Sequence, residues 1–458
     1  MLFHTWPFVL FFAIVYPVYL ILKKTRFGLP WLLIASYFFY AYVNPLYVVL
    51  ILYSTSVDFF AAARMEKSTQ RKIWLGLSVV NNLALLGFFK YGQFVTDNIN
   101  TILASSNIPY AIASPGILLP VGISFYVFQS MSYTIDYYRG NIERETSFIR
   151  YAAFVSLFPR LLAGPIERAG NLLPQMREYT KLSVRDFTDG LSLFVVGLFK
   201  KVALADYLAL YVNKIYGAPE QFQSPALLLG TFFFCWQIYF DFSGYTDMAR
   251  GVARMMGFRL MLNFNNPYLA TSLRDFWSRW HISLSSWFKD YVYIPLGGNR
   301  KGKFNTYKNM FLTMVISGLW HGAAWTFIIW GLVHAFGRFI TREAEQTVFY
   351  KQKIPTFAKQ LFVFGFVTLA WIFFRAESIS DAWIVITRIF SSGFADPQCP
   401  VLGLVLIFAV WIYQFITESK LKPLFENRAL RIAIVIFMIL YLVFFAPSSD
   451  QPFIYLRF

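Results

Sequence analysis

Long apolar runs alternate with short polar loops along almost the whole chain. Most of these runs approach the roughly 20 predominantly apolar residues that a helix needs to cross a bilayer. Helices are favoured in lipid because they satisfy their own backbone hydrogen bonds. The pattern therefore predicts an all-α polytopic membrane protein with about 11 or 12 transmembrane helices. The runs are residues 2–22, 31–43, 46–63, 73–89, 117–137, 188–211, 226–242, 309–323, 324–340, 361–374, 401–416 and 432–446.

The charge of the loops predicts how the chain is oriented. The loops at residues 23–27, 64–72 and 139–150 are basic, whereas residues 96–114 contain no Lys or Arg. Cytoplasmic loops of membrane proteins carry an excess of basic residues. We therefore expect a multi-pass protein whose basic loops lie in the cytoplasm and whose N-terminus and C-terminus lie outside.

Two segments interrupt the pattern within what we interpret as one membrane domain, residues 1–458. Residues 151–187 are charged and broken by prolines, which is typical of a re-entrant or interfacial segment. Residues 243–308 alternate aromatic and charged side chains, which favours short amphipathic helices at the cytosolic face. Residues 447–458 are expected to form an extracytoplasmic C-terminal tail.

Composition narrows the class of protein. The chain of 458 residues is 57% hydrophobic and only 14% charged, with a mean hydropathy of +0.50, which excludes a soluble enzyme with an anchor. The net charge of +17 lies in loops, so it reflects membrane orientation and does not indicate nucleic-acid binding. Cys235 and Cys399 predict no disulfide, and no Cys/His spacing suits zinc, so we expect no metal.

The run from Asn309 to Ile340 carries the most informative polar residue, His321. An ionisable side chain at membrane depth is costly and is by default a candidate functional group. The alternative is a histidine that is hydrogen-bonded to a neighbouring helix. Gly318 and Gly322 would let another helix or a substrate approach the backbone. Lys201, inside the run 188–211, must line a polar cavity or snorkel, as must its neighbour Lys200.

Four motifs carry a resemblance to a known family. They are Phe158–Arg168, Tyr239–Gly251, Phe276–Arg300 and Trp320–Ala335. In this order they resemble the membrane-bound O-acyltransferases, and most of all the bacterial branch that includes alginate O-acetyltransferases, peptidoglycan O-acetylating proteins and teichoic-acid D-alanylating proteins. The resemblance implies a funnelled helical core and a place in the bacterial cytoplasmic (inner) membrane.

The family's two histidines correspond to His281 and His321, while His4 and His334 are weaker candidates and His334 is expected to be structural. The chain departs from the family pattern at Arg160, where an uncharged residue is expected. It also departs at Leu456–Arg457, in place of an aromatic residue and an amide. These departures do not affect the expected reaction type. They leave open which donor and which partner the protein prefers.

The residue chemistry fits acyl transfer from a thioester to a hydroxyl. A histidine buried among apolar residues stays neutral, so His321 can act as the base. Trp320 and Trp325 could form the walls of the site. His281 could orient the donor thioester or stabilise charge. The alternative is that His281 is an interfacial histidine that is hydrogen-bonded to backbone. The donor is expected to be acetyl-CoA or an acyl carrier thioester, with no cofactor bound. Its expected contacts are Arg279, Ser283, Asn299 and Arg300, although positive-inside charge explains the basic ones equally well.

The tail offers a route to an acceptor polysaccharide outside the membrane. Tyr455 lies between Phe453 and Phe458, which could anchor it in an apolar funnel. A phenol has a pKa of about 10 and a thiol one of about 8.5, so a phenyl ester keeps much of a thioester's transfer potential. We therefore expect Tyr455 to relay the acyl group to an extracytoplasmic acetyltransferase partner. The alternative is a tail that only docks this partner.

Two other functions remain open. A membrane transporter would predict repeated halves and paired intramembrane carboxylates, but Asp58, Asp136, Asp206 and Asp241 are all expected near the ends of spans. A non-catalytic scaffold of a complex that modifies a cell-surface polysaccharide is less favoured, because both family histidines are present.

Overall fold

The protein is helical throughout the part of the chain that the structure describes. The structure is a computed structural model that describes residues 1–116, 119–178, 182–445 and 453–454, and no strand occurs within these ranges. The chain divides into two compact units, each described by itself. Unit 1 comprises Met1–Leu191 and Met248–Met261, and unit 2 comprises Ser192–Asp247 and Leu262–Phe458.

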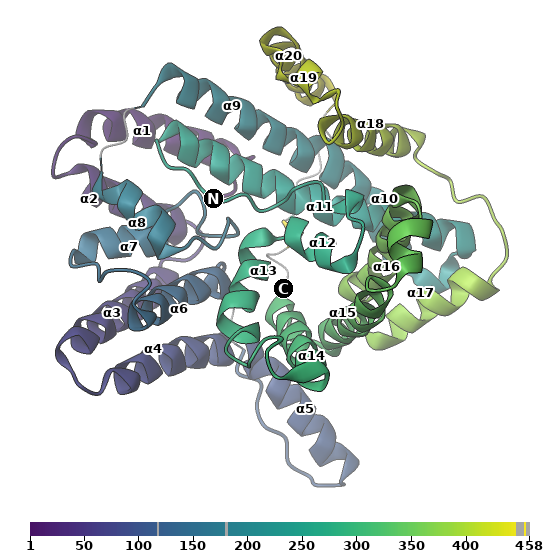
Figure 1. The fold of residues 1–458 in the computed structure, drawn as a ribbon, viewed down its shortest axis with the longest axis horizontal. Coiled ribbons are helices and arrows are strands. Elements are labelled where there is room, and N and C mark those ends of the chain that lie inside the picture. Colours follow the sequence, from purple (N-terminus) through teal and green to yellow (C-terminus); the bar gives the residue numbers. More distant parts are fainter. Residues whose placement is uncertain (117–118, 179–181, 446–452, 455–458) are drawn as a thin grey trace. The chain divides into compact units, whose positions relative to one another are not determined.

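Unit 1 contains the N-terminal helices (Figure 1). They are α1 (Trp6–Leu22), α2 (Gly28–Ala41), α3 (Leu46–Lys67), α4 (Arg71–Leu86), α5 (Gly92–Ser105), α6 (Ile123–Arg139), α7 (Phe148–Ser156) and α8 (Ala169–Arg177). Helices α9 (Val184–Phe199) and α11 (Ser224–Met255) each contribute residues to both units.

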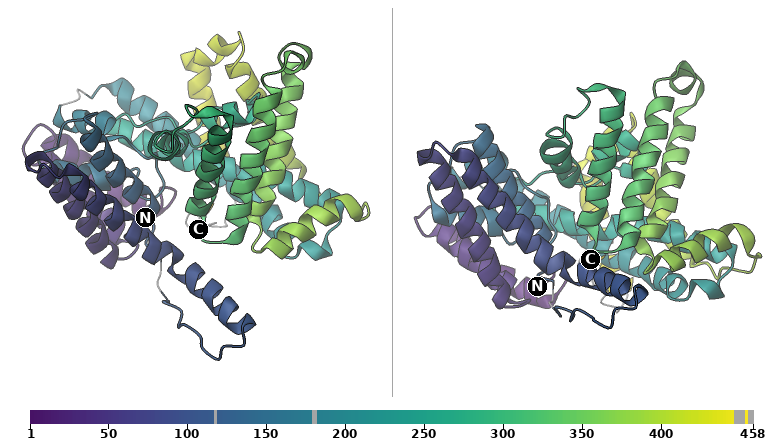
Figure 2. Two further views of the ribbon diagram at one scale, coloured as in Figure 1. Left: turned by 60° about the horizontal axis from the view of Figure 1, so that its bottom comes forward. Right: turned by 90° about the horizontal axis from the view of Figure 1, so that it is seen from below.

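Unit 2 contains the remaining helices, several of them drawn in green and yellow in Figure 2. They are α10 (Asp206–Tyr216), α12 (Leu273–Arg279), α13 (Ile282–Phe288), α14 (Gly302–His321), α15 (Trp325–Ala344), α16 (Thr356–Arg375), α17 (Ile379–Ser391), α18 (Val401–Thr417), α19 (Lys422–Glu426) and α20 (Arg428–Phe445). A π-helical segment, Lys200–Ala205, joins α9 to α10.

The helices have the length and composition of a multi-pass membrane protein. Five helical segments within the described ranges are long and apolar enough to span a bilayer. Apolar side chains such as Trp6 and Val443 are more than two thirds exposed, as lipid-facing residues would be. The five segments are Leu46–Lys67, Arg71–Ser105, Ser224–Met255, Thr356–Arg375 and Arg428–Phe445, and shorter apolar helices are Trp6–Leu22, Gly28–Ala41 and Val401–Thr417.

The centre of unit 1 is a polar cluster between α3, α4 and α6, which pack against one another. Asp58 is fully buried there and accepts hydrogen bonds from Ser78 Oγ at 2.7 Å and from Asn82 Nδ2 at 2.9 and 3.0 Å. The expectation that Asp58 lies near the end of a span is therefore wrong, because the side chain sits well inside α3.

The segment predicted to be re-entrant or interfacial contains α7, an irregular turn and α8. Residues 151–167 are buried within unit 1, so their irregular backbone is enclosed by protein. The unexpected Arg160 has a role here, because its guanidinium donates to the carbonyl of Val155 at 2.8 Å and to that of Phe154. Whether the segment lies at the membrane interface stays a prediction.

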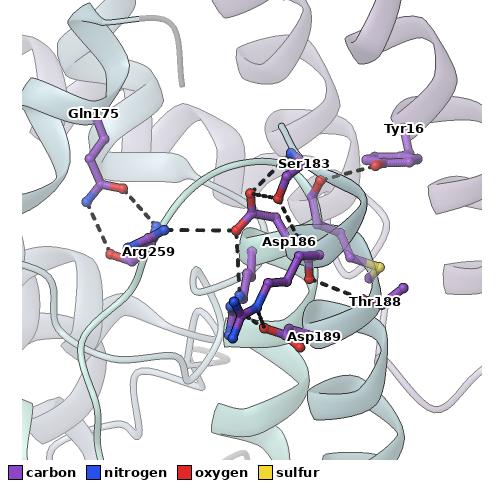
Figure 3. A network of polar contacts seen from close by, with 10 residues as sticks. Tyr16, Gln175, Ser183, Asp186, Thr188, Asp189 and Arg259 are labelled. Carbon is purple, nitrogen blue, oxygen red and sulfur yellow. Dashed lines mark hydrogen bonds and ion pairs between the residues drawn. The ribbon is translucent and has the colours of Figure 1, made fainter. Parts of the chain in front are cut away.

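A polar network holds the start of α9 against the end of α11 within unit 1 (Figure 3). Ser183 Oγ accepts from the Asp186 N–H at 3.1 Å, which caps the first turn of α9. Arg254 donates to Asp189 Oδ2 at 2.6 Å, and Gln175 hydrogen-bonds both the N–H and the carbonyl of Arg259. These contacts explain why residues 248–261 belong to unit 1.

In unit 2, α14 and α15 form a close hairpin because glycines line their contact. A Cβ at Gly318 would lie 2.3 Å from the carbonyl oxygen of Phe327, and one at Gly331 would lie 2.5 Å from that of Met314. The run 309–340 therefore forms two helices whose backbones approach through Gly318, as the small residues predicted.

We predict that Gly318→Ala destabilises the protein by about 1–3 kcal/mol, because the new methyl group forces two helix backbones apart. Gly365→Ala in α16 is the matched control, since nothing lies within 4 Å of its Cβ position. It should keep or raise stability, because Ala favours a helix over Gly. Thermal unfolding of the purified protein in detergent measures both changes, and equal effects would contradict the close hairpin.

Candidate active site

The two histidines predicted from the sequence both lie close to one tryptophan in unit 2. His321 is the last residue of α14, and His281 precedes the first residue of α13. The ring of Trp320 lies 5.1 Å from that of His321 and 6.1 Å from that of His281, measured between centroids. Both histidines are buried, with 3% and 0% exposure.

Aromatic rings surround His321. Trp330 and Phe374 present edge contacts at centroid distances of 5.0 and 5.3 Å, in addition to Trp320. Gly322 follows at the end of α14, where a Cβ would lie 2.0 Å from the ring of Phe327. The imidazole therefore lies among apolar aromatic rings.

His281 is held by a polar contact. Its backbone has φ 43°, a left-handed conformation that few non-glycine residues adopt. Its Nδ1 lies 3.1 Å from Asn263 Oδ1, which also accepts from the Ser283 N–H at 3.2 Å and from Ser283 Oγ at 2.9 Å. Since Asn263 Oδ1 acts as an acceptor, Nδ1 carries the proton and Nε2 is the basic nitrogen. Burial lowers the pKa of His281 to about 3, so the ring is neutral.

The other predicted contact residues differ in their surroundings. Arg279 pairs with Asp275 at 2.8 Å and with Glu418 at 2.5 Å, so carboxylates of the chain itself occupy its guanidinium. Trp325 begins α15 and is 52% exposed, unlike the buried Trp320. Two further predicted contacts are exposed in the turn before α14, namely Asn299 and Arg300.

Unit 2 contains a cavity of about 340 Å³. Phe327 forms part of its wall, and the Phe327 ring lies 4.9 Å from Phe374, the ring that contacts His321. Two aromatic rings, Phe327 and Phe374, therefore lead from the cavity to the imidazole. Its wall is formed by Lys201, Ala205, Asp206, Asn213, Phe234, Gln237, Asp241, Ala324, Thr326, Phe327, Arg375, Ala376, Glu377 and Ile454.

A buried ionic triad forms one side of this cavity. Lys201 Nζ lies 2.8 Å from Asp206 Oδ1 and 2.8 Å from Asp241 Oδ1, and all three side chains are at most 4% exposed. Of the two alternatives expected for the lysines, Lys201 lines a polar cavity, whereas Lys200 pairs with Asp247 at 2.7 Å. Asp206 and Asp241 are both buried at this cavity, and their expected place near the ends of spans stays a prediction.

Part of the C-terminal tail reaches the same place. The Phe453 ring stacks on Tyr245 at 4.9 Å and lies 5.9 Å from Phe242, whose ring is 4.6 Å from His281. The N–H of Ile454 donates to Asp241 Oδ2 at 2.6 Å, and Ile454 lines the cavity. Tyr455 lies outside the described residues, so its predicted role is untested.

Sequence reasoning missed Asn263, Phe242 and the pairing of Lys201 with Asp206 and Asp241. Asn263 opens the stretch NFNN, and Asp241 and Phe242 belong to the motif Tyr239–Gly251. Polar residues directly beside long apolar runs were the available signal, but their partners lie far away in the sequence.

The described part of the chain offers few groups for a metal. No set of three or more His, Cys, Asp or Glu side chains within the described ranges is arranged to hold a metal ion. Cys235 and Cys399 are both free thiols.

An all-helical membrane fold, with two buried histidines and a cavity in unit 2, is the arrangement of a membrane-embedded acyl-transfer enzyme. The family model described as the membrane-bound O-acyltransferase family matches residues 141–380, slightly more than half of the chain. The chain belongs to the membrane-bound O-acyltransferase family, and it is an O-acyltransferase.

Similar proteins come from several bacteria. A probable alginate O-acetylase of Azotobacter vinelandii is 42% identical over 379 residues, which cover 81% of this chain and 74% of the relative. A probable alginate O-acetylase of Pseudomonas aeruginosa is 43% identical, with coverage of 79% and 69%. A peptidoglycan O-acetyltransferase of Helicobacter pylori is 37% identical, with coverage of 79% and 73%.

We predict that Asn263→Ala lowers acyl-transfer activity about 10- to 100-fold, because the imidazole of His281 loses the group that fixes its orientation. Consumption of an acetyl thioester by the purified protein measures the effect. Ser285→Ala is the matched control, since Ser285 Oγ makes one hydrogen bond, to the Trp280 carbonyl at 3.1 Å, in the same segment. Equal losses in both variants would mean that Asn263 only supports local folding.

Proposed function

We propose that this O-acyltransferase moves an acetyl or other short acyl group from a cytosolic thioester across the membrane, for O-acetylation of an extracytoplasmic polysaccharide. One observation carries the proposal: two packed aromatic rings, Phe374 and Phe327, connect buried His321 to a cavity that Ile454 of the tail helps to line. An acyl acceptor placed there would meet a neutral base in a site that excludes bulk water.

The transfer proceeds in two steps. In the first, His321 takes the phenolic proton of Tyr455 while the phenol oxygen attacks the thioester carbonyl. The C–S bond breaks, and the proton passes from His321 to the leaving thiolate, giving a free thiol and an acetylated Tyr455. In the second, a hydroxyl of an external acceptor attacks the phenyl ester, and the phenol is restored with its proton.

His281 has a supporting role in this scheme. Asn263 fixes its ring so that Nε2 is the basic nitrogen, and Trp320 lies between the two imidazoles. We assign it the task of orienting the thioester carbonyl at Trp320. Ser283 shares Asn263 with His281, so it acts on the donor only through that residue.

The donor, acetyl-CoA or an acyl carrier thioester, carries phosphate groups that basic residues attract. Exposed cations gather in residues 274–308 of the segment that we place at the cytosolic face: Arg274, Arg300, Lys301 and Lys308. Asn299 lies in the same exposed turn as Arg300 and Lys301. Arg279 is held by Asp275 and Glu418, and it shapes this face instead of binding the donor directly.

The relatives suggest the acceptor and the compartment. Their names include alginate O-acetylase and peptidoglycan O-acetyltransferase, so a cell-surface polysaccharide is the acceptor class that we favour. We place the chain in the bacterial inner membrane with both termini outside. Residues 447–458 then meet an extracytoplasmic acetyltransferase partner, which passes the acyl group on.

The transporter alternative retains one supporting observation, the buried triad of Lys201, Asp206 and Asp241. In a transport site the carboxylates would be accessible to the transported ion, whereas Asp241 already accepts a hydrogen bond from the tail. The scaffold alternative does not explain why the two histidines converge on Trp320.

We predict that His321→Ala lowers thioester consumption by about 10²- to 10⁴-fold, the usual contribution of a general base. His334→Phe is the control, because His334 is equally buried among aromatic rings and neither of its ring nitrogens has a hydrogen-bond partner in the described part of the chain. It should retain activity. If His321→Ala consumed the thioester as fast as His334→Phe, His321 would not be the base.

We predict that Tyr455→Phe abolishes acetylation of the polysaccharide in cells, because the variant has no hydroxyl to carry the acyl group. Tyr455→Phe keeps the aromatic ring, so docking of a partner through an apolar contact would survive. Esterification of Tyr455, measured by mass spectrometry after reaction with the donor, gives a direct readout. Undiminished acetylation in the variant would rule out the relay.

A further inference from the structure

The tail forms a hydrogen bond with the buried triad of Lys201, Asp206 and Asp241. Lys201 supplies one positive charge, whereas Asp206 and Asp241 supply two carboxylates. The two oxygens of Asp241 have separate partners: Oδ1 faces the ammonium of Lys201 at 2.8 Å, and Oδ2 accepts from the Ile454 N–H at 2.6 Å. A hydrogen bond from a backbone N–H to a carboxylate is stronger than one between two neutral groups.

The tail also fits an apolar socket one helical turn along α11. Residues four apart share a face of a helix, so Tyr245 lies on the same side of α11 as Asp241. The Phe453 ring stacks on Tyr245 with an interplanar angle of 28° and is 1% exposed. Two consecutive tail residues are thus bound, one by its ring and the next by its backbone N–H.

We propose that Asp241, oriented by Lys201, is the positioning residue that docks the tail in the cavity. The proposal rests on the function proposed above, in which Tyr455 carries the acyl group. Tyr455 directly follows Ile454 in the sequence. A hydrogen bond that holds the backbone of Ile454 therefore restrains the residue next to the proposed acyl carrier. Asp241 touches neither donor nor acceptor in this role, and it acts through the tail alone.

The alternative interpretation is that the triad only stabilises helix packing. The other carboxylate of the triad, Asp206, provides a control that tests this alternative. Asp206 pairs with the same ammonium at the same 2.8 Å and is equally buried. Only Asp241 bonds to Ile454 among the pairs described here. Loss of either carboxylate disturbs Lys201, but only loss of Asp241 removes the acceptor of the Ile454 N–H.

Hydrogen–deuterium exchange of the full chain in detergent tests the docking without any turnover. The readout is the exchange rate of the Ile454 amide, resolved by fragmentation of the peptides that contain it. We expect Asp241→Ala to speed this exchange at least about tenfold, because the amide loses a charged acceptor. Asp206→Ala should stay within about twofold of the wild type. Equal rates in both variants, or no change in Asp241→Ala, would overturn the proposal.

A second pair of variants leaves the triad intact, in case the first pair folds poorly. Ile454→Pro removes the N–H donor, whereas Ile454→Ala removes side-chain atoms but keeps the donor. We expect Ile454→Pro to lose at least about 90% of both thioester consumption and polysaccharide acetylation, because Tyr455 is the acceptor in the first step, and Ile454→Ala to retain both. Both variants should unfold at the temperature of the wild type in detergent, which separates docking from a merely structural role. Equal activities of the two variants would contradict the docking.

Failure of this inference and failure of the relay are distinguishable. If Tyr455→Phe acetylates normally while Asp241→Ala releases the amide, the tail is docked but carries no acyl group. If Tyr455→Phe is inactive while the Ile454 amide is unaffected by Asp241→Ala, the relay stands and the docking by Asp241 is wrong.

Discussion

A lysine buried among apolar helices imposes the main constraint on unit 2. Removing an ammonium from water costs several kcal/mol even after the protein relaxes, unless opposite charge lies close by. Lys201 meets this requirement with Asp206 and Asp241, both at 2.8 Å. Two carboxylates overcompensate one cation, and the remaining negative charge is stabilised by a backbone N–H of the tail. The polar wall of the cavity and the position of Phe453–Ile454 thus follow from one buried charge.

Unit 1 also buries a carboxylate, that of Asp58, and surrounds it with neutral hydrogen-bond donors. Ser78 and Asn82 donate three hydrogen bonds to Asp58 from the neighbouring helix α4. Neutral donors arranged in this way hold helices together but offer little to an incoming ligand, because the oxygens of the carboxylate are already satisfied. Asp58 therefore serves the fold, whereas Asp241 binds a residue of the tail that is far away in the sequence.

The helices were largely predictable, because they follow from the periodic apolar runs. The boundary expected between residues 323 and 324 falls within the turn between α14 and α15, where Gly322 lies. The start of α14 at Gly302 was not predictable, because polar residues 302–308 extend the helix beyond its apolar part. His281 and His321 were found through a resemblance, but Asn263 was not, since a hydrogen bond across an irregular segment leaves no periodic signal. The Asp241–Ile454 bond joins residues 213 positions apart and had no local signature at all.

Phe242 connects the parts of the site that sequence reasoning treated separately. The Phe242 ring packs edge to face with His281 at a centroid distance of 4.6 Å and also lies against Phe453. Interiors are close-packed, so a displaced Phe453 would uncover part of Phe242 and loosen the packing around His281. Asn263 contacts that imidazole at Nδ1, and the Phe242 ring packs against it edge to face. The donor-side histidine and the tail are therefore packed through a common side chain, and the order of one depends on the presence of the other.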